Sequence, residues 1–189
     1  TLNYTENASA AVIDNTITIT DADDIQLVGG TITISSGFTN GDILALANQN
    51  GISGNFDSST GEITISGITS IENYQNALRS ITYYSTSEDP TNTSSSRSIT
   101  WIITDANSDG AGAEVSTSVT STINITPEST SPVVTAAGTL AYTENGSAAV
   151  IDNTITLSDA DDTQMSGATT TISSGFTSGD VLGFTDQNG

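Results

Sequence analysis

The chain of 189 residues contains no cysteine, no histidine and no lysine, and its two cationic side chains are Arg79 and Arg97. Without cysteine or histidine there can be no Cys/His zinc site, thiol nucleophile or disulfide, and the commonest general base is missing. No apolar run approaches the ~20 residues that span a bilayer, so we expect no membrane insertion. There is no initial Met or signal peptide, and we expect an excerpt of a longer protein. We predict that the protein is not an enzyme.

Acidic residues dominate the charge: 22 Asp and Glu stand against two arginines, which gives a net charge of −20. Long-range repulsion therefore disfavours nucleic acid and anionic lipid as partners. The chain is nevertheless not typical of disorder, because 34% of its residues are hydrophobic and 33 Thr accompany many Val and Ile. These residue types favour half-buried strands, and they predict a folded, mostly β protein.

The sequence repeats itself over a long period. Residues 1–51 recur at 139–189 with an offset of 138 and no gap, and 36 of the 51 aligned residues are identical. Solenoid units are only about 20–50 residues long, so this period indicates an array of whole domains. Pro127 and Pro132 lie in a polar stretch that is typical of a stiff linker. We predict a domain at 1–126, a linker at 127–138, and the first third of a second repeat at 139–189.

Short alternating segments predict the fold class. Ile and Thr alternate at 16–20 and 31–35, the period-2 pattern of a strand with one buried face. A turn-rich loop predicts a hairpin between 52–56 and 63–65, and further apolar runs lie at 81–84, 99–103 and 115–125. We expect these segments to belong to a set of about eight or nine short strands. A capping-box pattern begins a short helix at 70–79. We expect Arg79 to be its solvated tip, and the alternative is a pair between Arg79 and a carboxylate. These elements predict an all-β sandwich of the cadherin/immunoglobulin-like type, repeated in tandem with one short helix per repeat.

Carboxylates gather at the ends of predicted strands. Asp21, Asp23 and Asp24 follow the segment 16–20, and Asp105 and Asp109 follow 99–104. At an effective dielectric constant near 20, two such charges 4 Å apart repel by roughly 4 kcal/mol, which a divalent cation would relieve. Calcium takes six to eight oxygen ligands and is favoured over magnesium, which holds its water more tightly. The alternative interpretation is that these residues are solvated turn residues, for which Asp is well suited.

Three motifs in the same order resemble those of cadherin repeats: Thr5-Glu6-Asn7, the DADD tetrad that begins at Asp21, and Thr104-Asp105-Ala106. The chain looks like the cadherin-like modules of large bacterial surface proteins, including type I-secreted adhesins. The resemblance implies that Glu6 lies at one end of the domain and Asp21, Asp23 and Asp105 at the other. Whether calcium bridges two repeats or sits within one is left open. The predicted calcium ligands are Glu6, Asp21, Asp23, Asp24, Asp105, Asp109, Glu144, Asp159, Asp161 and Asp162.

From these patterns we expect a structural and adhesive module of a secreted or cell-surface protein. Calcium would stiffen it, and it would extend a stalk or filament for cell adhesion. Its expected partners are neighbouring repeats of the same chain and other copies in a fibre. The alternative is a carbohydrate-binding module for exopolysaccharide, in which Tyr84 stacks on a sugar ring; Trp101, in the middle of a predicted strand, is expected in the core.

Overall fold

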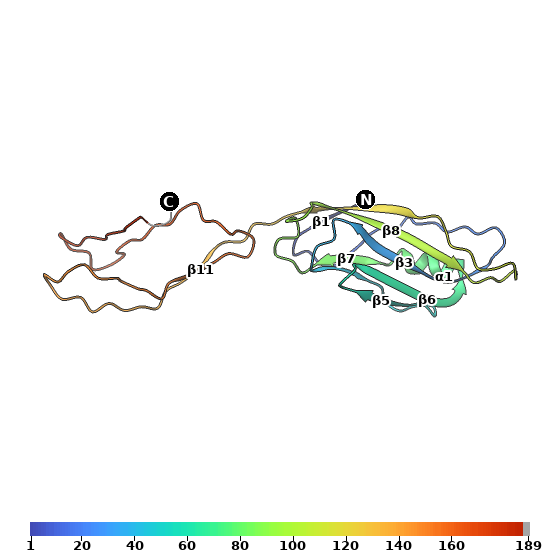
Figure 1. Cartoon of the computed structure of the whole chain (residues 1–189), viewed down its shortest axis with the longest axis horizontal. Coiled ribbons are helices and arrows are strands. Elements are labelled where there is room, and N and C mark those ends of the chain that lie inside the picture. Colours follow the sequence, from blue (N-terminus) through green and yellow to red (C-terminus); the bar gives the residue numbers. More distant parts are fainter. Residues whose placement is uncertain (187–189) are drawn as a thin grey trace. The chain divides into compact units, whose positions relative to one another are not determined.

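The computed structural model describes residues 1–186, which form a first unit, residues 1–129, and a second unit from residue 130 onward (Figure 1). Residues 187–189, the last three of the predicted second repeat, lie outside the described residues. Within residues 1–186 no helix is long and apolar enough to cross a membrane. The predicted boundaries of the repeat and of its linker at 127–138 stay predictions.

The first unit consists of two sheets. A six-stranded sheet has the order β1-β9-β8-β3-β6-β5, and a three-stranded sheet has the order β2-β7-β4. All neighbouring strands are antiparallel except β1 and β9, which are parallel. The prediction of an all-β fold is therefore confirmed. The strands are β1 (Leu2–Thr5), β2 (Ala11–Val12), β3 (Gln26–Ser36), β4 (Asp42–Ala45), β5 (Ser53–Asp57), β6 (Glu62–Ser70), β7 (Thr82–Ser85), β8 (Ser96–Asp105) and β9 (Val119–Thr126).

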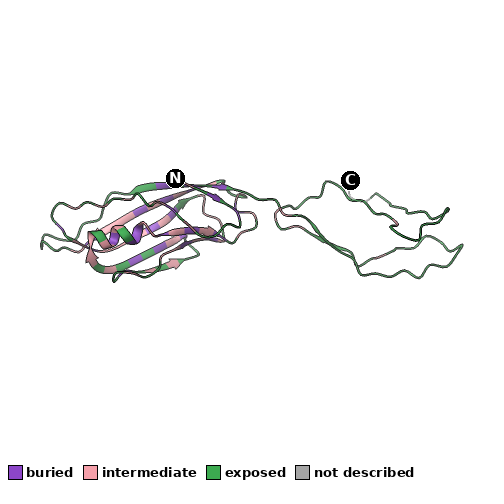
Figure 2. Ribbon diagram, turned by 180° about the vertical axis from the view of Figure 1, so that it is seen from behind, coloured by how far each residue is buried: buried purple, intermediate pink, exposed green. Residues whose placement is uncertain are grey.

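Alternation along the strands places one apolar face of each sheet in a shared core. Ile32 and Ile34 of β3 are buried, as is Trp101 of β8, whose Nε1 donates to Ser121 Oγ at 3.1 Å. The prediction that Trp101 packs in the core is thus confirmed. Tyr4 of β1 meets Tyr83 of β7 edge-on, with ring centroids 5.0 Å apart, so an aromatic pair joins the two sheets. Figure 2 shows these buried stripes along the strands of the first unit.

The helix α1 (Ile71–Leu78) confirms the predicted helix at 70–79. Ser70 caps its first turn, where the hydroxyl accepts a hydrogen bond from the Asn73 amide at 3.3 Å. Tyr74 and Leu78 turn one face of the helix into the core. Positions equivalent to α1 in a second repeat fall past residue 189, so the prediction of one helix per repeat stays a prediction.

The predicted strand at 16–20 is wrong. This segment pairs with no strand in the described part of the chain and instead lies along α1, where Gln75 Oε1 accepts from the Ile19 amide at 3.2 Å. Arg79 Nε donates to the Ile17 carbonyl at 2.7 Å, so Arg79 is not the solvated tip that we expected. Alternating apolar and polar residues indicate an extended backbone with one buried side. Here that side, with Ile17 and Ile19, is partly buried without belonging to a sheet, and α1 lies beside it. The last predicted strand also begins later than expected, at Val119 instead of residue 115.

The other cation is in the core of the first unit. Arg97 of β8 is fully buried, and its Nε lies 2.6 Å from Oδ2 of Asp42, which is buried as well. The guanidinium also donates to Asp42 Oδ1 and to three backbone carbonyls, so five hydrogen bonds surround it. Tyr83 and the Thr39 amide add two donors to the carboxylate. A buried pair of this kind is tolerated because each charge is matched by hydrogen bonds.

The second unit contains much less regular structure. Within residues 130–186 the strands are β10 (Val133–Thr135) and β11 (Thr156–Ser158), which pair antiparallel. Most described residues of this unit are exposed, as the colours in Figure 2 show. The residues of the second sequence copy therefore do not build a second sandwich by themselves, and tandem repetition of the fold stays a prediction.

Arg97→Met should destabilise the first unit by about 3–5 kcal/mol, because it leaves Asp42 buried without its counter-charge. Denaturant unfolding monitored by Trp101 fluorescence measures the loss. Arg79→Met, which removes the other arginine and one hydrogen bond to a carbonyl, is the matched control and should cost about 1 kcal/mol. The double variant Asp42→Asn/Arg97→Met should be more stable than Arg97→Met alone. Equal losses for both arginines would contradict a stabilising role of the buried pair.

Candidate metal centre

Three carboxylates meet in the loop before β3. Asp21, Asp23 and Asp24 each offer an oxygen atom, and these atoms all lie within 4.8 Å of one another. We call this group the first aspartate centre. In the second unit Asp159, Asp161 and Asp162 form the equivalent group, the second aspartate centre, under the same distance limit. Carboxylate oxygens are hard ligands that suit calcium or magnesium, so the chemistry of both groups fits a divalent cation.

The local fold of the tetrad draws the carboxylates together. Asp21 Oδ1 accepts hydrogen bonds from the amides of Asp23 at 3.3 Å and Asp24 at 3.1 Å. Asp159 Oδ1 does the same for Asp161 at 3.2 Å and Asp162 at 3.0 Å. An aspartate that bonds to its own backbone two and three residues on is a common turn former. The tetrad therefore adopts one conformation in both copies, although the second copy lacks a surrounding sandwich.

Asp24 connects the centre to the loop after β8. It is buried, and its Oδ1 accepts from the amide and the hydroxyl of Ser108 and from the Asp109 amide. The Ser108 hydroxyl in turn accepts from the Ile25 amide at 3.1 Å. Sequence reasoning missed Ser108, whose one signal is its place in the Asn-Ser-Asp-Gly turn after β8. The two acidic loops that the sequence predicted are thus joined by a neutral serine.

The electrostatics of the centre are unbalanced. A hydrogen bond to Asp21 raises the pKa of Asp23, and burial and the negative charges of Asp21 and Asp109 raise it further. The amides of Asp24 and Asp23 lower the pKa of Asp21. Asp21 and Asp23 thus repel each other once both are ionised. A cation that binds between them would relieve this repulsion.

Asp109 is near the first aspartate centre, as its effect on Asp23 and its amide bond to Asp24 show. Asp105 is buried at the same end of the unit, but its carboxylate closes its own loop, with Oδ1 accepting from Asn107 at 3.0 Å and Oδ2 from Glu114 at 2.8 Å. Among the described residues it is not part of the three-carboxylate group. Its role as a ligand stays a prediction.

Glu6 is at the other end of the first unit. It follows β1, its amide donates to the Thr126 carbonyl at 2.9 Å, and its Oε2 accepts from the Glu128 amide at 2.8 Å. Because β8 runs antiparallel to β9, the last residues of these two strands lie at different ends of the sheet. Glu6 lies at the end where β9 finishes, and Asp105 lies at the end where β8 finishes. The structure thus does not bring Glu6 to the first aspartate centre. Glu144, its copy in the second unit, is exposed, and both remain predicted ligands.

The second aspartate centre has an additional partner. Thr130 donates its amide to Asp161 Oδ2 at 2.9 Å, and its hydroxyl donates to Asp161 Oδ1. These bonds, the hydroxyl first, lower the pKa of Asp161. Asp161 is therefore kept ionised, as a metal ligand must be.

Tyr84, the predicted sugar-stacking residue, is half-buried on β7, in register with Ile43 of β4. It is next to the buried Tyr83 and on the opposite face of its strand, where it packs against the edge of the core. Binding of carbohydrate there stays a prediction.

In chelator, Asp23→Asn should raise the melting temperature at pH 7 and change it little at pH 3. The pKa of Asp23 is raised above 3.8, so its carboxyl favours folding when protonated and opposes folding once the pH exceeds that raised value. Thermal melts followed by circular dichroism measure the difference. Asp57→Asn is the control of opposite sign, because the Ser59 hydroxyl lowers the pKa of Asp57 and its charge favours folding at pH 7. A lower melting temperature for Asp23→Asn at pH 7 in chelator would contradict the repulsion.

Comparison with known proteins gives one similarity. The chain is 36% identical over 86 residues to Halomucin of Haloquadratum walsbyi, and the matched stretch covers 42% of this chain. No protein-family model matches the chain, and no solved structure matches it. The match covers 1% of Halomucin, so this chain spans only a very small part of the length of that relative.

Proposed function

We propose that the chain is a calcium-stiffened, cadherin-like structural module of a long extracellular surface protein. The observation that carries the proposal is the three-carboxylate group, which takes the same local conformation in both sequence copies. Three carboxylates that each place an oxygen within 4.8 Å of the others offer a set of ligands for a cation, and neither arginine pairs with them: Arg79 donates to the Ile17 carbonyl and Arg97 to Asp42. Calcium is the proposed ion because it accepts irregular oxygen cages more readily than magnesium does.

The proposed stiffening of the first unit depends on the two loops that the first aspartate centre connects, the loop before β3 and the loop after β8. Asp24 already joins the start of β3 to the loop after β8 through Ser108 and Asp109. An ion held by Asp21, Asp23 and Asp24 would neutralise the repulsion that opposes this junction. It would therefore fix the ends of the two longest neighbouring strands of the six-stranded sheet. Local opening of this end of the unit would then require loss of the ion.

The extracellular location is supported by three observations. The chain resembles part of Halomucin, a protein many times longer than itself. It has no cysteine, and a bound metal would replace disulfides as the external stabiliser of a secreted domain. Its own sequence repeats over 138 residues, as in a protein whose length is built from domains. Adhesion, with neighbouring repeats and other copies in a fibre as partners, is part of this proposal.

Addition of calcium at about 100 times its Kd should stabilise the first unit by about 2.7 kcal/mol and raise its melting temperature by roughly 8–10 °C. Chelator should reverse the shift, and sodium chloride at equal ionic strength should not reproduce it. Asp21→Asn should abolish the calcium-dependent shift, because it removes one ligand and the bonds that shape the loop. Asp57→Asn, an exposed turn aspartate outside the centre, is the matched control and should retain the full shift. An unchanged melt in calcium would contradict the metal site.

A further inference from the structure

The outer face of the six-stranded sheet carries threonine, serine and asparagine on all six strands. On β3, Ile32 and Ile34 are buried, so the alternating Thr31 and Thr33 lie on the outer side. Thr100 of β8 is in register with Thr33, and the outward positions of β1, β9, β6 and β5 continue the same pattern across the sheet. We call the outward residues of these six strands the hydroxyl face.

The hydroxyl face carries little charge. Its charged residues are Asp57 and Glu62, which are in register at one corner, on the edge strand β5 and its neighbour β6. The other acidic residues of the first unit lie in loops, on α1, or, for Asp42 and Asp105, at buried ends of strands. In a chain with a net charge of −20, this is a broad surface on which two copies can approach without opposing carboxylates.

Many polar groups of the hydroxyl face already have partners within it. Thr100 Oγ1 donates to Ser35 Oγ at 2.7 Å, and Ser35 Oγ donates to the Ser98 carbonyl at 3.1 Å. Asn124 Nδ2 donates to Asn3 Oδ1 at 3.1 Å across β9 and β1. Polar groups that keep a partner lose less free energy when water is removed, and threonine side chains are stiff, so ordering them costs little entropy. Covering this face therefore costs less than covering one of long charged side chains.

The hydroxyl face is large enough for a specific contact. Six strands about 4.8 Å apart make it roughly 25 Å wide, and six to nine residues per strand make it roughly 20–30 Å long. Two such faces in contact would bury about 1,000–1,500 Å² in total, at the lower end of the range for specific interfaces. Sheets of this kind pack face to face about 10 Å apart with their strands nearly aligned.

The chemistry of the hydroxyl face favours a second copy over other partners. No lysine or arginine of the described chain lies on it, since Arg97 is buried and Arg79 follows α1, so it offers nothing to a polyanion. The aromatic residues of these six strands, Tyr4, Phe56 and Trp101, face inward, so no ring is available to stack on a sugar. Hydroxyl groups both donate and accept, so the face is complementary to itself.

We infer that the hydroxyl face is the surface by which copies of this protein associate side by side, as a symmetric pair of six-stranded sheets. In such a pair the same surface is used by both copies, and residues near its centre, such as Thr100, meet the corresponding region of the partner. The inference deepens the proposed function, because it names the surface through which other copies in a fibre make contact. It rests on that proposal for the long array, but the contact itself does not require calcium.

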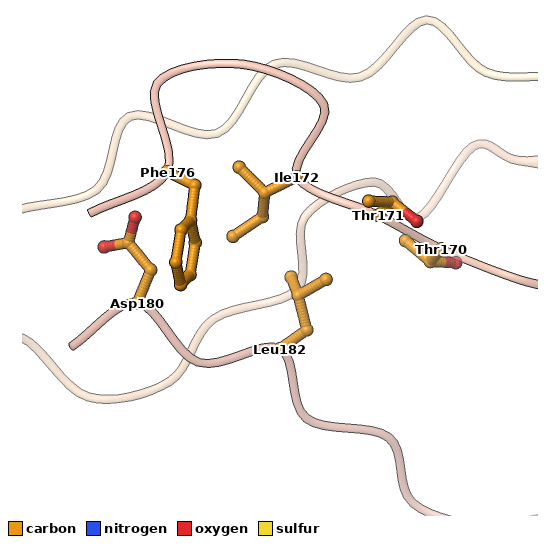
Figure 3. Close-up of a pocket in the computed structure, with 6 residues that line it drawn as sticks. All are labelled: Thr170, Thr171, Ile172, Phe176, Asp180 and Leu182. Atoms are coloured by element: carbon orange, nitrogen blue, oxygen red, sulfur yellow. The ribbon is translucent and has the colours of Figure 1, made fainter. Parts of the chain in front are cut away.

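The second sequence copy retains the hydroxyl pattern. Thr169, Thr171 and Ser173 stand at the positions of residues 31, 33 and 35. Ile172, the copy of the buried Ile34, points toward Phe176 in Figure 3, so the alternation is retained as well. A weak contact that recurs along an array gains avidity, by a factor of about 10²–10⁴ for linked sites. A weak association of single units is therefore sufficient for lateral association of long chains.

Sedimentation equilibrium of the full chain tests the inference. Association should strengthen by about tenfold or more between 0.1 M and 1 M sodium chloride, because the Debye length falls from about 10 Å to about 3 Å and the net charges repel less. Thr100→Asp should weaken association at 1 M salt by about tenfold or more, because it puts a charge at the centre of each face. Asn76→Asp, which adds the same charge on an exposed position of α1, is the matched control and should associate like the wild type.

Disulfide trapping provides a second measurement that does not depend on the stability of the aspartate variant. The chain has no cysteine, so a single engineered cysteine reports which surfaces meet. Under oxidising conditions Thr100→Cys should form disulfide-linked dimers several times faster than Asn76→Cys. Both experiments are carried out in chelator and in calcium. Association in chelator supports the inference even where calcium fails to raise the melting temperature, so the two proposals fail separately.

Four results would overturn the inference. The first is a chain that stays monomeric at 1 M salt and millimolar concentration. The second is equal association of the wild type and Thr100→Asp, which would place the contact on another surface. The third is equal trapping of Thr100→Cys and Asn76→Cys. The fourth is retention of a neutral polysaccharide such as dextran by a chain that stays monomeric, with retention lost in Thr100→Asp, which would assign the face to carbohydrate.

Discussion

Long-range strand pairing is the constraint on which the rest of the structure depends. Because β1 pairs with β9, and β3 with β6 and β8, the six-stranded sheet is complete only when the chain has reached Thr126, whereas the three-stranded sheet is complete at Ser85. Such non-local contacts make folding slow and leave apolar surface exposed in the meantime. The core, the burial of Arg97 and the meeting of the acidic loops all follow from the same pairing.

The positions of the two arginines explain why no cationic side chain balances the acidic loops. Arg97 forms an ion pair with Asp42 in the core, and Arg79 donates a hydrogen bond to the Ile17 carbonyl in the segment beside α1. Backbone amides and hydroxyl groups then become the main donors to carboxylates: Ser108 serves Asp24, and Thr130 serves Asp161. Amides can orient a carboxylate, but they do not cancel its charge. The balance of charge at the aspartate centres is therefore left to ions in solution.

Local sequence patterns predicted many of the strands and the helix. They did not predict the contacts between residues that are far apart in the sequence. Alternation identified the middle of β3 and β8, and a capping pattern identified α1. The same alternation misled at 16–20, because an extended segment beside a helix has the same period as a strand. Arg97 shares a face of β8 with Trp101, so its burial was readable in principle. Its partner Asp42 lies 55 residues away, and Ser108 lies 84 residues from Asp24, so no local signal joins either pair.

The parallel pairing of β1 and β9 determines how the first unit bears load. Leu2 is in register with Ile123 and Thr5 with Thr126, so the two terminal strands lie side by side and run in the same direction. A force that pulls the two ends of the unit apart draws these strands past each other along their length. All the hydrogen bonds between them are then strained together in shear, instead of opening one at a time from one end. The first and last strands thus form a mechanical clamp, closed by the Glu6 amide on the Thr126 carbonyl.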